Sequence, residues 1–120
     1  MQRKPITVGI AAHNEENSLP QTIKHLKKQL TAEDEIIVVA GGCSDQTVQV
    51  TKDLRLDNLK LFVQKKREGK ATAQNIIKKE AKNDIIVFCD ADVIIAPEAI
   101  NMLIKHFTHK KVAAVSAYET

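Results

Sequence analysis

Two carboxylates, Asp90 and Asp92, interrupt the apolar stretch IIVFCDADVII at residues 85–95. In an extended strand, residues two apart point to the same side, so both acids would face one ligand. Divalent cations such as Mg²⁺ or Mn²⁺ relieve the repulsion between neighbouring carboxylates, and they could bridge to a diphosphate leaving group. For an isolated D-x-D pattern, however, a strand end followed by an Asp turn is the commoner explanation.

A second candidate segment is AGGCSDQT at residues 40–47. Two glycines after a strand let the backbone approach a ligand closely, and the following helix start offers N–H groups to an anion. The segment fits neither the G-x-G-x-x-G fingerprint nor a Walker A loop. A tight strand-to-helix turn capped by Ser44 or Asp45 explains it slightly better on its own.

Basic side chains and a histidine occur in two further polar segments. In KKREGK at residues 65–70, Arg67 and Lys70 could contact a phosphate or a base, and a solvated loop explains them equally well. In AHNEE at residues 12–16, His13 could form part of a ligand site. A lone histidine is more often structural, and no metal-ligand spacing surrounds this one.

Five apolar, β-branched runs alternate with helical patterns. Asn14 is expected to be the N-cap of the first helix, and Pro97 to begin the fourth. Continuous apolar strands indicate a sheet covered on both faces, and the alternation predicts right-handed βαβ units. The sequence therefore predicts an α/β fold in three layers with a mostly parallel sheet. The expected strands are residues 6–12, 35–40, 59–64, 84–89 and 112–118.

Ligands of open α/β sheets bind at the carboxyl ends of the strands. The segments HNEE, GGCSD and DADV follow the first, second and fourth predicted strands, so we expect them along one edge of the sheet. This placement makes a metal role for Asp90 and Asp92 as plausible as a turn alone.

The bulk composition narrows the function classes. The 120 residues fit one domain, with 43% hydrophobic and 28% charged residues. Only 3% are aromatic and there is no Trp, which argues against a base-stacking nucleic-acid surface. The net charge of +3 suits a phosphorylated ligand or an anionic membrane surface, although a solvated lysine-rich face is the simpler explanation.

Two cysteines, Cys43 and Cys89, stand at predicted strand ends and lack the spacing of a metal or disulfide framework. In a doubly wound sheet they would lie two strand spacings, roughly 9–10 Å, apart, which is too far for a disulfide. The N-terminal segment resembles no signal peptide, and no stretch is long enough to span a bilayer. We therefore expect a reducing, cytoplasmic compartment, with peripheral association at the inner face of the membrane left open.

Taken in order, these segments resemble the nucleotide-binding half of family-two inverting glycosyltransferases, which have the Rossmann-like GT-A fold. AAHNEE corresponds to the family's P-x-Y-N-E segment, and VVAGGCSDQT to its D-D-G-S-x-D segment. GKATAQN matches the G-K-x-x-A-x-N helix start, and CDAD matches the D-x-D motif. The order and spacing agree over essentially the whole chain.

The resemblance implies a role for each matching position. Asp92 would ligate the Mn²⁺ or Mg²⁺ that binds the diphosphate of a nucleotide sugar, and Asp90 would contact the ribose or the waters of the metal. Asp45 and Asn75 would brace the loops. Donor contacts are expected from Ala12, His13, Glu15, Ala40, Gly41, Arg67, Lys70 and Asp90.

Three positions depart from the family pattern. The first acid of D-D-G-S, which often binds the base, is Ala40, the second acid is Gly41, and the usual Tyr is His13. The base contact made by that acid is therefore missing. Another base, or recognition by the backbone, becomes an open alternative.

In the family, a second half of the protein supplies acceptor contacts and an acidic general base, which an inverting transfer needs to deprotonate the acceptor hydroxyl. No residue of 1–120 matches that role, so we expect a single donor-binding domain that is incomplete at its C-terminus. A truncated reading frame, an excised domain and half of a two-chain enzyme are the alternatives. Lipid-linked and saccharide acceptors fit equally.

The family fold also places a later antiparallel strand between the fourth and fifth strands, and this chain lacks it. We expect either repacking of the final segment or self-association through the open edge beside the fourth strand. Two other classes of protein share features of this pattern. A receiver-like signalling domain would need an Asp after the third strand, where the chain has FVQKKREG. A non-catalytic α/β scaffold is the main alternative.

Overall fold

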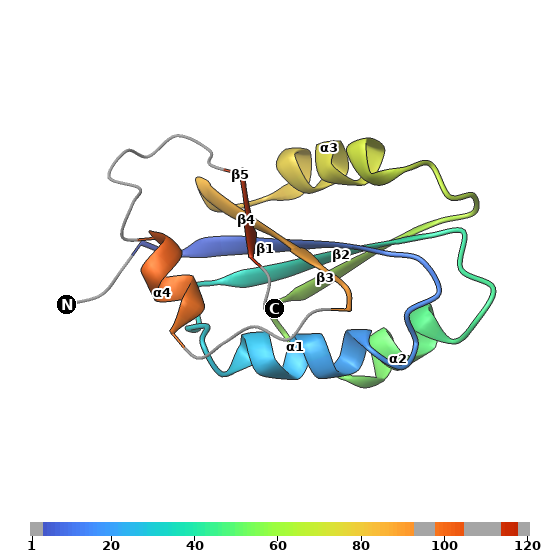
Figure 1. Ribbon diagram of the computed structural model, residues 1–120, viewed down its shortest axis with the longest axis horizontal. Coiled ribbons are helices and arrows are strands. Elements are labelled where there is room, and N and C mark those ends of the chain that lie inside the picture. Colours follow the sequence, from blue (N-terminus) through green and yellow to red (C-terminus); the bar gives the residue numbers. More distant parts are fainter. Residues whose placement is uncertain (1–3, 93–97, 105–113, 118–120) are drawn as a thin grey trace.

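The computed structural model describes residues 4–92, 98–104 and 114–117. Its centre is a five-stranded sheet in the order β3-β2-β1-β4-β5, in which every described pair is parallel. Helix α3 covers one face, and α1 and α2 cover the other (Figure 1). The predicted three-layer α/β fold is confirmed.

The strands are β1 (Ile6–Ala12), β2 (Glu35–Gly41), β3 (Leu59–Gln64), β4 (Ile85–Asp90) and β5 (Ala114–Ala117). The helices are α1 (Leu19–Lys27), α2 (Thr47–Asp53), α3 (Lys70–Glu80) and α4 (Ala99–Ile104).

The strand order separates this fold from the receiver-like alternative. Receiver domains share the flavodoxin-like order 2-1-3-4-5, in which the third strand lies beside the first. Here β4 lies beside β1, and β3 pairs only with β2 among the described strands. This is the order of the Rossmann fold, so the receiver-like alternative is wrong.

The core has two apolar layers because successive residues of each strand point to opposite faces of the sheet. In β2, Ile36 and Val38 pack in the layer that contains α1, whereas Ile37 and Val39 pack in the layer beneath α3. All four are at most 1% exposed. Burial on both faces explains the nearly continuous apolar runs of the central strands.

Helix α3 packs unusually close to the central strand. A Cβ added at Gly9 of β1 would lie only 2.6 Å from Cγ2 of Ile77, so the contact requires glycine. Because the helix lies so near the sheet, its first residue, Lys70, reaches Asp90 at the end of β4.

The first helix begins later than predicted. Asn14 is not its N-cap, because α1 starts at Leu19 and the chain turns at residues 14–18. Asn14 instead adopts a left-handed φ of 54°, which Asn tolerates better than most residues. Its Oδ1 accepts hydrogen bonds from the N–H groups of Ser44 (2.8 Å) and Asp45 (3.3 Å) in the loop after β2.

The fifth strand pairs directly with β4, for example Val87 with Val115. Of the two expected outcomes for this edge, repacking of the final segment is the one observed. The predicted helix start at Pro97 lies outside the described residues. In the part of the chain that the structure describes, no helix is both long and apolar enough to cross a membrane.

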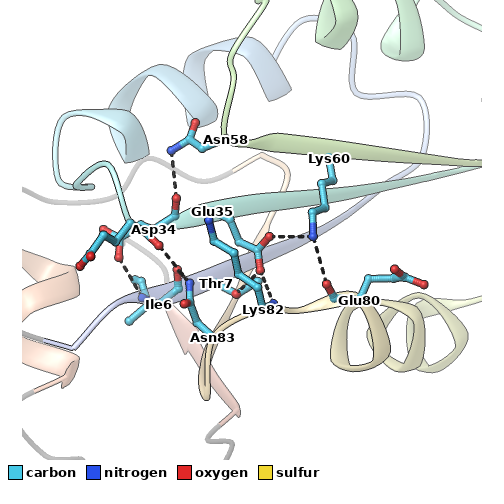
Figure 2. Close-up of polar contacts among 10 residues, drawn as sticks. Ile6, Thr7, Asp34, Glu35, Asn58, Lys60, Glu80, Lys82 and Asn83 are labelled. Atoms are coloured by element: carbon cyan, nitrogen blue, oxygen red, sulfur yellow. Dashed lines mark hydrogen bonds and ion pairs between the residues drawn. The ribbon is translucent and has the colours of Figure 1, made fainter.

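A polar network ties the amino ends of the strands together (Figure 2). Glu35 of β2 has a side chain only 2% exposed, and its Oε2 accepts hydrogen bonds from Thr7 Oγ1 (2.6 Å) and the N–H of Lys82 (2.6 Å). Its Oε1 lies 3.2 Å from the ammonium of Lys60, which also donates to the carbonyl of Glu80 (3.3 Å). One carboxylate thus links β1, β2, β3 and the segment before β4.

The preceding residue extends this network. Asp34 is fully buried, and its Oδ1 accepts a hydrogen bond from the N–H of Ile6 (2.8 Å). Asn83 Nδ2 donates to the carbonyl of Ile6 (2.9 Å), and Asn58 Nδ2 donates to the carbonyl of Asp34 (3.1 Å). The buried polar groups at this edge are therefore paired, Glu35 Oε1 only through its ion pair with Lys60, and this pairing offsets the cost of their burial.

The pKa of Glu35 reflects two opposing effects. Burial raises the pKa of the carboxyl. The hydrogen bonds from Thr7 and Lys82 and the ammonium of Lys60 lower it by more, so the folded-state pKa lies below the ordinary 4.5. Because folding lowers this pKa, the carboxylate contributes stability above pH 4.5, and the contribution is lost as pH falls through the folded-state pKa.

We expect Glu35→Gln to lower the free energy of unfolding by about 1–3 kcal/mol at neutral pH, because the new amide N–H would face existing donors. Urea unfolding at several pH values measures this. The gap between wild type and variant should shrink below pH 4.5. The matched control Glu33→Gln, at an exposed position, should stay within about 0.5 kcal/mol of wild type. An equal loss in both variants would contradict this role of Glu35.

Candidate functional site

The carboxyl ends of β1 and β2 are joined by a histidine. His13 Nδ1 lies 2.7 Å from the carbonyl oxygen of Gly41. Since a carbonyl can only accept, Nδ1 carries the proton and donates this hydrogen bond. The predicted convergence of the segments after the first and second strands at one edge is confirmed.

A second set of bonds braces the same two loops. Asp45 Oδ1 accepts hydrogen bonds from the N–H (2.9 Å) and the hydroxyl of Thr47, and its Oδ2 accepts from the N–H of Glu16 (3.2 Å). Thr47 Oγ1 also accepts from the N–H of Glu15 (2.8 Å). Desolvation raises the pKa of Asp45, but these bonds outweigh it and leave the pKa below its usual value. The bracing that the family resemblance implies for Asp45 is present, whereas Asn75 is exposed on α3.

Gly41, the last residue of β2, and Gly42 lie against the loop that follows β3. A Cβ at Gly42 would lie 2.5 Å from the backbone N of Arg67, and Gly42 has a φ of 57°. The N–H of Gly42 donates to the carbonyl of Gln64 (3.0 Å). The sequence suggested that these glycines admit a ligand, but at Gly42 the closely approaching group is the protein's own backbone. The loop after β3, residues 65–69, is thereby held against the loop after β2.

A pocket of about 130 Å³ opens between these loops and the start of α3. Ala40, which was expected to contact the donor, is fully buried and does not line it. Asp90 lines a smaller neighbouring pocket of about 20 Å³ that shares Ala11 and Lys70 with the first. The other predicted donor contacts all line the larger pocket, namely Ala12, His13, Glu15, Gly41, Arg67 and Lys70.

The acidic pair lies at the β4 end of this site. Lys70 Nζ contacts Asp90 Oδ1 at 3.0 Å, and the two side chains are 65% and 43% exposed. The strand ends at Asp90, and Asp92 is exposed in the turn that follows, so the expected extended geometry does not reach Asp92. Burial, and then the charges of Asp90 and Asp92, raise the pKa of Cys89 to about 12.

The described residues do not form a closed metal site of protein ligands alone. No group of three or more His, Cys, Asp or Glu side chains among the described residues could hold a metal ion. Mg²⁺-type sites commonly use one or two carboxylates and take their other ligands from water and substrate phosphates. Asp90 and Asp92 fit a cation of that kind, completed by a phosphorylated ligand.

Some pocket residues were not expected from the sequence, among them Gln64 and Glu68. Gln64 is the last residue of β3 and pairs in register with Gly41. Gln64 is a polar residue at the end of an apolar strand, on the same edge as the other strand ends. This position could have identified it as a pocket residue from the sequence.

The chain matches the model of glycosyl transferase family 2 over residues 7–119, and it belongs to this family. It is 31% identical over 113 residues to a poly-beta-1,6-N-acetyl-D-glucosamine synthase of Staphylococcus aureus, covering 92% of this chain and 27% of that protein. It is 30% identical to the O-antigen chain rhamnosyltransferase RfbN of Salmonella typhimurium, of which it covers 35%. The chain therefore spans about a third or less of these relatives.

Solved structures agree on the fold. TarS 1–349 of S. aureus superimposes with a TM-score of 0.75 at 26% identity, covering 82% of this chain and 31% of that one. A mannosyltransferase of Pyrobaculum calidifontis gives a TM-score of 0.82 at 23% identity, covering 90% and 33%. The predicted family and GT-A fold are confirmed.

We expect Gly42→Ala to lower the free energy of unfolding by about 1–3 kcal/mol, because its methyl group would collide with the backbone of Arg67. Gly42→Asn separates this collision from backbone strain, since Asn tolerates positive φ but carries the same Cβ. Urea unfolding of both variants, with amide spectra to follow Arg67, should show both destabilised and the Arg67 signal displaced. Wild-type stability in Gly42→Asn would contradict the contact.

Proposed function

We propose that this chain is the donor-binding domain of an inverting glycosyltransferase, which holds a nucleotide-diphospho-sugar and presents its sugar to an acceptor. The observation that carries the proposal is the pocket at the carboxyl edge of the sheet, where loops from β1, β2 and β3 meet Lys70 of α3. Membership in family 2 supports the reaction class.

The strand order suggests how the nucleotide sugar is oriented along the carboxyl edge of the sheet. Along this edge, Gln64 ends β3 and Gly41 ends β2. His13 then follows β1, and Asp90 ends β4. Neighbouring strands are about 4.8 Å apart, so Gln64 and Asp90 are separated by three spacings, roughly 14 Å. We assign the base to the β3–β2 end and the diphosphate to the β4 end, because Lys70 and the two acids lie there.

Arg67 and Lys70 supply the positive charge of the site, and both are exposed at its rim. Lys70 already neutralises Asp90 through an exposed ion pair, which costs little to rearrange. We propose that Lys70 contacts a phosphate oxygen when the donor binds. Asp90 is then free to contact the ribose or the metal's waters.

Asp92, with Asp90 beside it, would hold a divalent cation, Mn²⁺ or Mg²⁺. When bound, such a cation neutralises charge on the departing diphosphate. The P. calidifontis mannosyltransferase, which has the same fold, was solved in complex with GDP-Man and Mn²⁺. That complex supports the metal and the donor class for this chain.

We assign donor binding, and not the complete reaction, to residues 1–120, because no residue here matches the family's general base. The relatives' names include a polysaccharide synthase and an O-antigen rhamnosyltransferase, which favours a saccharide or lipid-linked acceptor. The free thiols Cys43 and Cys89 favour a cytoplasmic site of action.

We expect Mn²⁺-dependent binding of UDP or GDP, measured by isothermal titration calorimetry, and a loss of at least about tenfold in affinity in Asp92→Asn, because a metal ligand is removed. The matched control Asp57→Asn, exposed before β3, should bind like wild type.

Two results would count against this proposal. Binding that neither EDTA nor Asp92→Asn weakens would remove the metal from the site. A flat response to every nucleoside diphosphate and nucleotide sugar, with and without Mn²⁺, would favour the non-catalytic scaffold.

A further inference from the structure

We infer that Gln64 reads the nucleobase of the bound donor, in the place where this chain lacks an acid. The inference rests on the proposed function, because it assigns a specificity-determining residue within the same pocket. Gln64 ends β3, is half-buried, and lines the pocket together with His13 and Gly41.

The first support is the space above Gly41. A Cβ at this position would lie 2.9 Å from Oε1 of Gln64. The carboxamide therefore occupies the volume that a side chain at residue 41 would enter. Where the family pattern has its second acid, this chain has a glycine with an amide lying over it.

The second support is that the backbone of Gln64 is held in place while its carboxamide has free hydrogen-bonding groups. The backbone of Gln64 is fixed by its register with Gly41 and by the hydrogen bond from the N–H of Gly42 to its carbonyl (3.0 Å). Among the hydrogen bonds between described residues, none involves the side-chain amide of Gln64. Its donors and acceptor are thus available to a ligand in the pocket.

The third support is the charge pattern along the edge. Beside Gly41, Gln64 carries an uncharged amide, and the Nδ1–H of His13 donates to the Gly41 carbonyl. The ion pair of Lys70 and Asp90 lies toward β4. An uncharged amide at the β2 end can hydrogen-bond a base, while the charged pair at the β4 end suits a diphosphate.

The amide predicts which edge of a base it matches. A carboxamide offers a donor beside an acceptor, whereas a carboxylate only accepts. The N3–H and O4 of uracil complement the amide, and the adjacent N1–H and N2–H of guanine complement a carboxylate. Replacing Gln64 with Glu should therefore change the preference between bases as well as the overall affinity.

The test measures the dissociation constants of UDP and GDP in the presence of Mn²⁺ by titration calorimetry. Gln64→Glu should shift the ratio of the two constants toward GDP by about tenfold, the size expected when one bidentate base contact is exchanged. Gln21→Glu, an exposed position on α1, adds the same charge away from the pocket and should leave the ratio unchanged.

A second variant guards against misfolding of the first. Gly41→Ala places a methyl group against the amide of Gln64 and should weaken the wild-type base preference without adding charge. Circular dichroism confirms that each variant is folded.

The outcomes separate the two levels of the proposal. A change of equal size for UDP and GDP in Gln64→Glu, or no change, overturns the role of Gln64 while leaving donor binding intact. No binding of any nucleoside diphosphate by the folded wild type overturns the proposed function, and this inference with it.

Discussion

The backbone contact between Gly42 and Arg67 is the constraint on which the pocket depends. Because residue 42 has no side chain, the loop after β3 can lie against the loop after β2, with a would-be Cβ only 2.5 Å from the Arg67 nitrogen. The register of β3 with β2 places Gln64 beside Gly41, and the close approach places Arg67 at the rim of the pocket. His13 then closes the third side through its bond to the Gly41 carbonyl. The three strand-end loops are therefore one coupled structure.

The two edges of the same sheet are built for different purposes. At the amino edge, Glu35 is almost fully buried and is held by neighbours from several strands (Figure 2). At the carboxyl edge, the acids are exposed, and the pair of Lys70 with Asp90 is of the kind that contributes at most about 1 kcal/mol. The amino edge therefore carries stability, while the carboxyl edge keeps charged groups that a ligand can recruit at small cost.

Periodicity and strand-end polarity were sufficient to predict the parallel three-layer fold and most of the pocket lining. They failed where a residue's role depends on a distant contact. Asn14 follows a strand and suits a helix cap, but its oxygen binds the loop after β2, thirty residues away in sequence. Asp92 shares a motif with Asp90, yet the strand ends between them. Gln64 acquires its place only because a glycine lies opposite it in the neighbouring strand.

The segments that we assign to the donor are distributed along the carboxyl edge of the sheet. Residues 7–119 match the family model, and they contain the loops that we assign to the donor. In the proposed arrangement the base lies at the β3–β2 end and the metal at the β4 end, so the two contacts come from different segments of the sequence. In this chain the acids at the β4 end match the family pattern, whereas the β2 end departs from it at Ala40 and Gly41.

The central claim is that a nucleoside diphosphate and a divalent cation bind together at the carboxyl edge. Paramagnetic broadening of amide signals by Mn²⁺, recorded with UDP or GDP present, tests it most directly because the effect reports distance from the ion. The account predicts the strongest broadening at Asp90, Asp92 and Lys70, weaker effects at Gln64, and none at Glu35 on the opposite edge. Broadening centred on Glu35, or spread evenly over the surface, would contradict it.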